Sequence, residues 1–202
     1  MLPRIVIGYS DILDSAFSKF KSYKYDAKRY KEGERYAKQL QKSWNRYDKE
    51  LLSCLSKLTK LRWHRNYIEC CVSFKTPFSF SKPLTILIYK NINYGVATIT
   101  HELCHILLWE NRHKIKWPES NTGIYKKYKK ESYNTKLHLL VHSIVILTMK
   151  KVFVKGAENY LTWERFWEHW PRDPMRKDYI RSWKIVDKEG PRNIIKELIK
   201  GI

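Results

Sequence analysis

The sequence between positions 98 and 108 reads Thr98-Ile99-Thr100-His101-Glu102-Leu103-Cys104-His105-Ile106-Leu107-Leu108, with the pattern H-E-x-x-H at its centre. Apolar side chains flank this pattern on both sides, which favours an α-helix buried in the middle of a domain. A helix turns by about 100° per residue, so His101 and His105 would lie about 40° apart on one face, with Glu102 beside them at about 100°. Two imidazoles one turn apart and a carboxylate next to them indicate a metal site.

The chemistry that this pattern predicts is metal-assisted hydrolysis. The imidazoles of His101 and His105 would bind Zn²⁺, while Glu102, too far round the helix to ligate the ion, would take a proton from an activated water. Burying such polar groups without partners is costly, and a metal ion is a common partner for them. The alternative is a helix whose histidines are satisfied by protein groups and hold no metal.

At these five positions the sequence resembles the zincin superfamily of metallopeptidases. The resemblance implies that His101 and His105 are zinc ligands, that Glu102 is the general base, and that the substrate is a protein or peptide. The metzincin subgroup continues its pattern with a glycine and a third histidine, but Leu108 and Asn111 occupy those positions here. A gluzincin-like or an SprT-like relationship stays open.

A catalytic zinc usually has three protein ligands, so a third must come from elsewhere in the chain. A helix predicted over 132–152 carries His138 and His142, four residues apart and therefore on one face. Gluzincins use a glutamate from a later helix, whereas the resemblance to SprT-like proteases makes a third histidine ordinary. We therefore rank His138 first as the third ligand, His142 as its alternative and Glu131 behind both, and we expect His113 on the surface.

The chain is strongly basic. Its 202 residues include 40 Lys and Arg against 20 Asp and Glu, which gives a formal net charge of +20. Such a chain attracts polyanions, so non-specific binding of nucleic acid through the basic surface is a possible partnership. The alternative function is accordingly a nucleic-acid-binding protein with a structural or absent metal, or a protease associated with DNA.

No stretch of the sequence predicts export or a membrane partner. The apolar run near the N-terminus is too short for a secretion signal, and the longest one, over 139–149, is shorter than the ~20 residues that cross a bilayer. We expect an intracellular, cytoplasmic protein. Four cysteines in such a chain predict reduced thiols rather than disulfides: Cys54, Cys70, Cys71 and Cys104.

The order of patterns predicts an α+β fold, in which a small mixed sheet packs against the central metal-binding helix and further helices. Apolar residues spaced by three and four from Tyr36 to Leu58 predict one amphipathic helix within a helical N-terminal region. Alternation over 68–74 and a β-branched run over 84–89 predict strands. By the zincin resemblance, one of these two strands would lie at the edge of the sheet and pair with substrate.

The remaining segments complete the expected organisation. Residues 114–130 are polar and predict a loop, while 161–170 predicts a short aromatic helix. A Tyr or Arg within the last fifty residues would hold the oxyanion, and the sequence does not choose which. We expect a basic helical region over 1–60 and a zincin-like catalytic domain over 61–202, or one domain formed by both.

Overall fold

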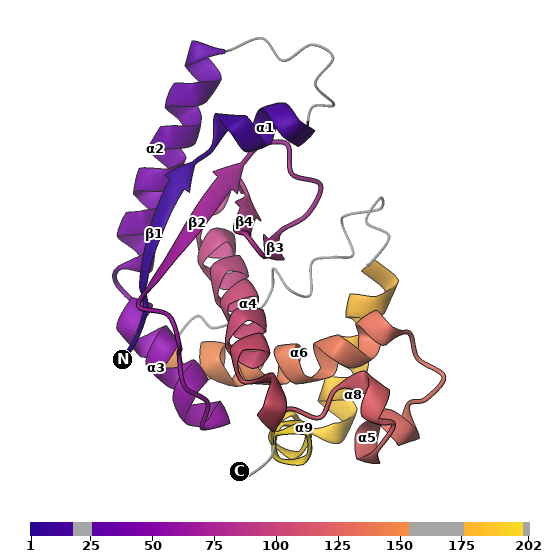
Figure 1. Ribbon diagram of the computed structural model, residues 1–202. Coiled ribbons are helices and arrows are strands. Elements are labelled where there is room, and N and C mark those ends of the chain that lie inside the picture. Colours follow the sequence, from indigo (N-terminus) through magenta and orange to yellow (C-terminus); the bar gives the residue numbers. More distant parts are fainter. Residues whose placement is uncertain (18–25, 154–175, 200–202) are drawn as a thin grey trace.

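The computed structural model describes residues 1–17, 26–153 and 176–199 (Figure 1). Its sheet has the strand order β1-β2-β4-β3. Strands β1, β2 and β4 run parallel to one another, and β3 runs antiparallel to β4. This mixed sheet with its covering helices confirms the predicted α+β class. The strands are β1 (Arg4–Tyr9), β2 (Tyr67–Ser73), β3 (Phe80–Ser81) and β4 (Leu84–Leu87).

Strand β1 is where the N-terminal region departs from the prediction, because the first element is a strand rather than a helix. Its buried Ile5 and Ile7 lie in register with Ile68 and Cys70 of β2. The run is short and its partner lies far along the chain, so the apolar residues alone did not reveal the pairing. As a result, the described parts of 1–60 and 61–202 share one sheet and one hydrophobic core.

Three helices follow β1: α1 (Asp11–Phe17), α2 (Ala27–Trp44) and α3 (Asp48–Thr59). The single helix predicted from Tyr36 to Leu58 is wrong, because the chain turns between α2 and α3, where the Tyr47 amide donates to the Trp44 carbonyl at 2.9 Å. The apolar stripe survives this turn since both helices bury it in the same core. The spacing of the apolar residues thus identified the buried face of the two helices but not the turn between them.

Helix α4 (Ile92–Glu110) carries the H-E-x-x-H pattern and is buried along most of its length. It begins at Asn91, whose side chain accepts a hydrogen bond from the Asn93 amide at 3.0 Å. It ends at Asn111, whose side-chain amide donates to the carbonyls of Leu107 at 2.9 Å and Arg62 at 2.8 Å. These bonds satisfy backbone groups that a helix end and a loop would otherwise leave unpaired.

The segment after α4 contains helical turns where the sequence predicted a loop over 114–130. It forms short helical turns, η1 (Arg112–Lys114) and η2 (Pro118–Ser120), and the helix α5 (Gly123–Lys127). Helix α6 (Tyr133–Val152) follows and matches the predicted span closely. Its start is capped by Ser132, whose hydroxyl oxygen accepts from the Thr135 amide at 3.0 Å.

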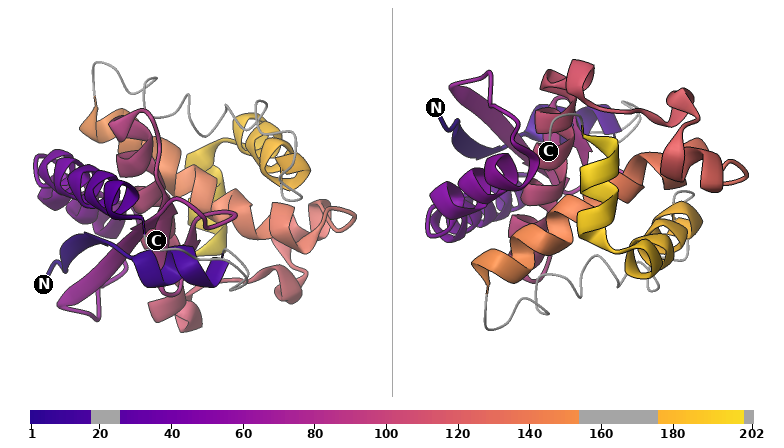
Figure 2. Two further views of the ribbon diagram at one scale, coloured as in Figure 1. Left: turned by 90° about the horizontal axis from the view of Figure 1, so that it is seen from above. Right: turned by 90° about the horizontal axis from the view of Figure 1, so that it is seen from below.

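Two groups of helices meet at α4. Helix α2 packs on β1 while α4 packs on β3 and β4, and the two helices contact each other (Figure 1). Helix α6 crosses the end of α4 that points away from the sheet, and it packs on α8 (Arg176–Glu189) and α9 (Pro191–Leu198) (Figure 2). The C-terminal half of α4, which holds both histidines of the pattern, therefore faces α6.

Neither strand proposed as the substrate-pairing edge lies at an edge. Strand β2 lies between β1 and β4, and β4 lies between β2 and β3, so the edges are β1 and the two-residue β3. The free side of β1 is covered by Gln41 of α2, which accepts from the Ile7 amide at 2.8 Å and donates to the Ile5 carbonyl at 3.2 Å. These two hydrogen bonds occupy backbone groups of β1 that could otherwise pair with another strand.

Three further expectations concern an aromatic helix, membrane-spanning segments and the cysteines. The aromatic helix expected over 161–170 lies outside the described residues. Within them, no helix combines the length and apolarity that crossing a bilayer requires. All four cysteines are free thiols, as the sequence predicted.

Candidate metal centre

Three histidines from two helices meet where α6 crosses α4. Helix α4 supplies His101 and His105, one turn apart, and α6 supplies His138. One ring nitrogen from each residue lies within 4.8 Å of the corresponding nitrogens of the other two. His101 and His138 are buried, and His105 is partly exposed. These three side chains are close enough to bind a metal ion.

The separation of the two histidines on α4 suits a shared ion. Their Nε2 atoms are 3.2 Å apart. Two nitrogens bound at ~2.0–2.1 Å to one tetrahedral ion are about 3.3 Å apart. The pair therefore already has the spacing that ligation requires, because the helix repeat places the two rings side by side.

The surroundings of His138 leave one of its ring nitrogens available as a ligand. Its Nδ1 donates to the Asn134 carbonyl at 2.8 Å, one turn earlier on α6, and this bond fixes the tautomer that leaves Nε2 with a free lone pair. Nε2 is buried and has no hydrogen-bond partner among the residues that the structure describes. Leaving a buried polar atom unpaired costs about 1–3 kcal/mol. A metal ion is a partner that would remove this cost.

His142, the alternative third ligand, occupies a different position. Its ring stacks on the indole of Trp183 in α8, with centroids 4.3 Å apart and planes 11° from parallel. Its centroid lies 5.3 Å from that of His138. Within the described residues, the group of potential ligands contains His138 and not His142. The geometry thus favours His138 as the third ligand.

The two lower-ranked candidates also lie apart from the three histidines. Glu131 accepts hydrogen bonds from both Nε and Nη2 of Arg181, at 2.8 and 2.6 Å. His113 is exposed on η1, as the sequence predicted. Among the residues that the structure describes, neither joins the potential ligand group.

The electrostatic environment favours the neutral forms of His105 and His138. Burial, together with the nearby His101, lowers the pKa of His138 to about 3. Burial and the neighbouring His101 and His138 lower the pKa of His105 well below its ordinary value. Neutral imidazole is the form that ligates a metal. His105 and His138 are therefore in the protonation state that binds a metal at neutral pH.

Glu102 follows His101 on α4 and is buried. Its charge contributes, after burial, to raising the pKa values of Cys70 on β2 and of Tyr89 just after β4. Within the described residues, Glu102 is not part of the group of potential ligands. Helix geometry explains this, since Glu102 lies about 100° round from His101.

Tyr179 is a neighbour of the cluster that the sequence could not single out. Its ring centroid lies 4.2 Å from that of His138 and 6.0 Å from that of His101. The adjacent Asp178 accepts from the hydroxyls of Ser132 at 2.6 Å and Thr135 at 3.1 Å, which ties α8 to the start of α6. Tyr179 and Trp183 are four residues apart and therefore share one face of α8. The sequence does not reveal which residues that face contacts.

No family model, curated protein or solved structure matches this chain. The geometry and chemistry of the three histidines and Glu102 therefore carry the functional interpretation.

Proposed function

We propose that this chain is a zinc-dependent metallopeptidase whose ion is held by His101, His105 and His138. The observation that carries the proposal concerns His138: its buried Nε2 has no hydrogen-bond partner among the described residues, and its ring offers a nitrogen within 4.8 Å of ring nitrogens of the H-E-x-x-H pair. Three imidazole nitrogens with an open fourth position form a donor set found in catalytic zinc sites.

Each neighbouring residue has a role that its position supports. A bound zinc ion would supply Lewis-acid chemistry, polarising a peptide carbonyl and making water more acidic. Glu102 would accept the proton of the attacking water and deliver it to the leaving amine. The Asn134 carbonyl holds the His138 ring in its ligating orientation. We assign the stabilisation of the oxyanion to Tyr179, whose ring lies against His138.

The test compares zinc-loaded wild-type protein with Glu102→Gln on a library of unfolded peptides, with new termini detected by mass spectrometry. The amide has nearly the shape of the carboxylate but cannot accept the proton, so we expect cleavage to fall by about 10²- to 10⁴-fold while zinc content is retained. Glu69→Gln, at an exposed position on β2, is the matched control and keeps wild-type activity. Wild-type cleavage by zinc-loaded Glu102→Gln would overturn the assigned role.

A further inference from the structure

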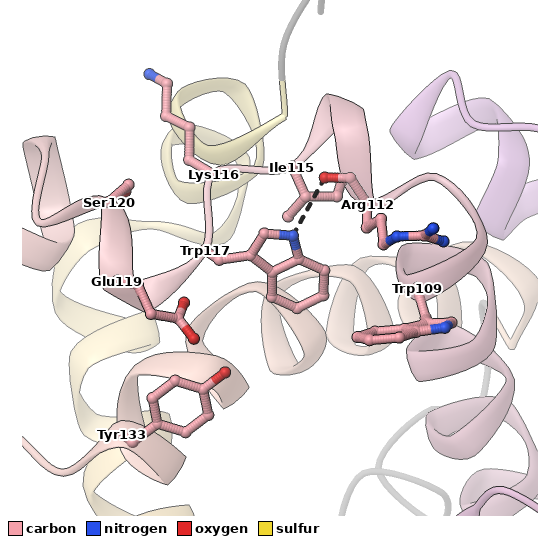
Figure 3. Close-up of a pocket in the computed structure, with 8 residues that line it drawn as sticks. All are labelled: Trp109, Arg112, Ile115, Lys116, Trp117, Glu119, Ser120 and Tyr133. Carbon is pink, nitrogen blue, oxygen red and sulfur yellow. Dashed lines mark hydrogen bonds between the residues drawn. The ribbon is translucent and has the colours of Figure 1, made fainter.

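A hollow lies one helical turn beyond His105, at the end of α4. Trp109 follows His105 by four residues on α4, which is about 6 Å along the axis, and Tyr133 is the first residue of α6. The hollow is thus built on the two helices that carry the histidine cluster. It is a pocket of about 540 Å³ lined by Trp109, Arg112, Ile115, Lys116, Trp117, Glu119, Ser120 and Tyr133 (Figure 3).

Three aromatic rings surround this pocket, and two of them face solvent. Trp109 is 49% exposed and Tyr133 is 52% exposed. Trp117 is held by a hydrogen bond from its indole Nε1 to the Arg112 carbonyl at 3.2 Å (Figure 3). Its ring lies edge-on to that of Trp109, with centroids 6.4 Å apart. Large exposed rings around one hollow indicate a binding surface rather than core packing.

Cations gather around the ring of Trp109, at the edge of the pocket. The Lys82 ammonium lies 3.9 Å from the centroid of the Trp109 ring, and the Arg112 guanidinium lies 5.5 Å from it. Burial and the nearby Arg65 and Arg112 lower the pKa of Lys82, so these like charges are close together. The nearby Glu110 is paired with Arg65 at 2.6 Å. This side of the pocket therefore suits an anion.

The opposite side of the pocket offers a hydrogen-bond acceptor between two rings. Glu119 lies between Trp117 and Tyr133, with its carboxylate in the pocket (Figure 3). Among the described residues that line the pocket, it is the only acid. Its carboxylate already has a hydrogen bond with the Tyr133 side chain. A carboxylate has two oxygens and several lone pairs, so it can also accept from the amino or imino group of a planar ring. The pocket therefore combines ring faces and an acceptor on one side with cations on the other.

We propose that this pocket binds an unpaired base of single-stranded nucleic acid, with the base against Trp117 and Tyr133 and the flanking phosphates on Lys82, Arg112 and Lys116. Aromatic platforms beside cations are the means by which proteins hold single strands without reading sequence. The occupant is argued from charge, because the chain carries +20 and attracts polyanions. Bases within a duplex are stacked and paired, so a duplex cannot present one to the pocket.

The binding test uses a short fluorescein-labelled single-stranded oligonucleotide and fluorescence anisotropy at several salt concentrations. Tyr133→Leu, at an exposed helix start, is expected to weaken binding about tenfold because it removes one stacking surface. Trp117→Leu should also weaken binding about tenfold. If Trp117→Leu fails to fold, Tyr133→Leu alone still decides the test. Wild-type affinity in Tyr133→Leu would overturn the proposal.

Charge-matched variants separate this pocket from general attraction to a basic surface. Arg112→Ala combined with Lys116→Ala removes two cations from the pocket, while Lys38→Ala combined with Lys49→Ala removes two from a separate hollow beside β1. We expect only the first pair to reduce the slope of log affinity against log salt by about two. Equal losses in both pairs would overturn the proposal.

Competitors and cleavage assays identify the occupant independently of the proposed peptidase. A duplex of the same length or an acidic peptide that displaces the probe as well as the unlabelled single strand would contradict the proposal. So would a Tyr133→Leu protein that loses peptide cleavage but keeps oligonucleotide affinity, because the pocket would then serve the peptide substrate. Oligonucleotide binding that depends on Tyr133 supports the proposal even if Glu102→Gln shows that the peptidase role is wrong.

Discussion

His138 differs from an ordinary core histidine in what its two ring nitrogens contact. A core histidine usually finds protein partners for both nitrogens. Here Nδ1 donates to the Asn134 carbonyl, while Nε2 is buried, has no hydrogen-bond partner within the described part of the chain, and belongs to a ring close to two other imidazoles. His142 lies one turn further along α6 with its ring stacked on Trp183. The two positions should therefore respond differently to substitution.

We expect His138→Ala to lower zinc affinity by more than 100-fold because it removes a ligand. Substituting a residue that only hydrogen-bonds to a ligand typically lowers metal affinity by about 10- to 100-fold. His142→Ala should retain stoichiometric zinc, since His142 is outside the ligand group. Competition with a chromogenic chelator measures both affinities, and His113→Ala, at an exposed position, controls for loss of any histidine. Zinc retained in His138→Ala and lost in His142→Ala would reverse the assignment.

The parts of the cluster differ in how far sequence alone could predict them. His101, Glu102 and His105 belong to one helix, so the helical repeat fixes their relative directions. The choice between His138 and His142 depends on how α6 is rotated against α4, which only the packing of the whole helix decides. Tyr179 reaches the cluster through contacts between α6 and α8 that leave no local pattern.

At the scale of elements, the close approach of α2 to β1 is sensitive to the addition of a single methyl group. A Cβ atom added to Gly33 would lie 2.4 Å from Cδ2 of the Tyr9 ring. That ring cannot swing away freely because the Tyr9 hydroxyl donates to the Asp14 carboxylate at 2.8 Å. Glycine at this position lets helix and strand pack together.

Gly33→Ala should accordingly destabilise the protein by about 1–3 kcal/mol, the usual cost of overpacking, although alanine is the better helix former. Gly8→Ala is the matched control, since a Cβ there meets nothing within 4 Å, and its free energy of unfolding should stay near the wild-type value. Urea unfolding followed by circular dichroism measures both. A Gly33→Ala protein as stable as wild type would show that the two elements separate easily.

Element prediction succeeded where a pattern was long and failed where it was short or continued through a turn. The apolar pattern over 132–152 and the alternation over 68–74 match α6 and β2 closely. Strand β1 was missed because six residues with a distant partner give little periodicity. The break between α2 and α3 was missed because both helices bury the same stripe.

At the scale of the whole molecule, the pairing of β1 with β2 joins the N-terminal helices to the part that carries the cluster. Core residues from both ranges, 1–60 and 61–202, belong to one cluster. We therefore expect a single cooperative unfolding transition in urea, with coincident curves from circular dichroism and tryptophan fluorescence. Two separated transitions would instead indicate that the two ranges fold as independent domains.

The central claim is that the three histidines bind zinc. The measurement that tests it most directly is the zinc content per chain, determined by inductively coupled plasma mass spectrometry after dialysis against metal-free buffer. Three imidazoles with ring nitrogens within 4.8 Å of one another predict stoichiometric zinc in the wild-type protein and its loss in His101→Ala. Wild-type protein that holds no stoichiometric zinc after reconstitution, or a His101→Ala protein that holds as much, would contradict the metal centre and the peptidase proposed from it.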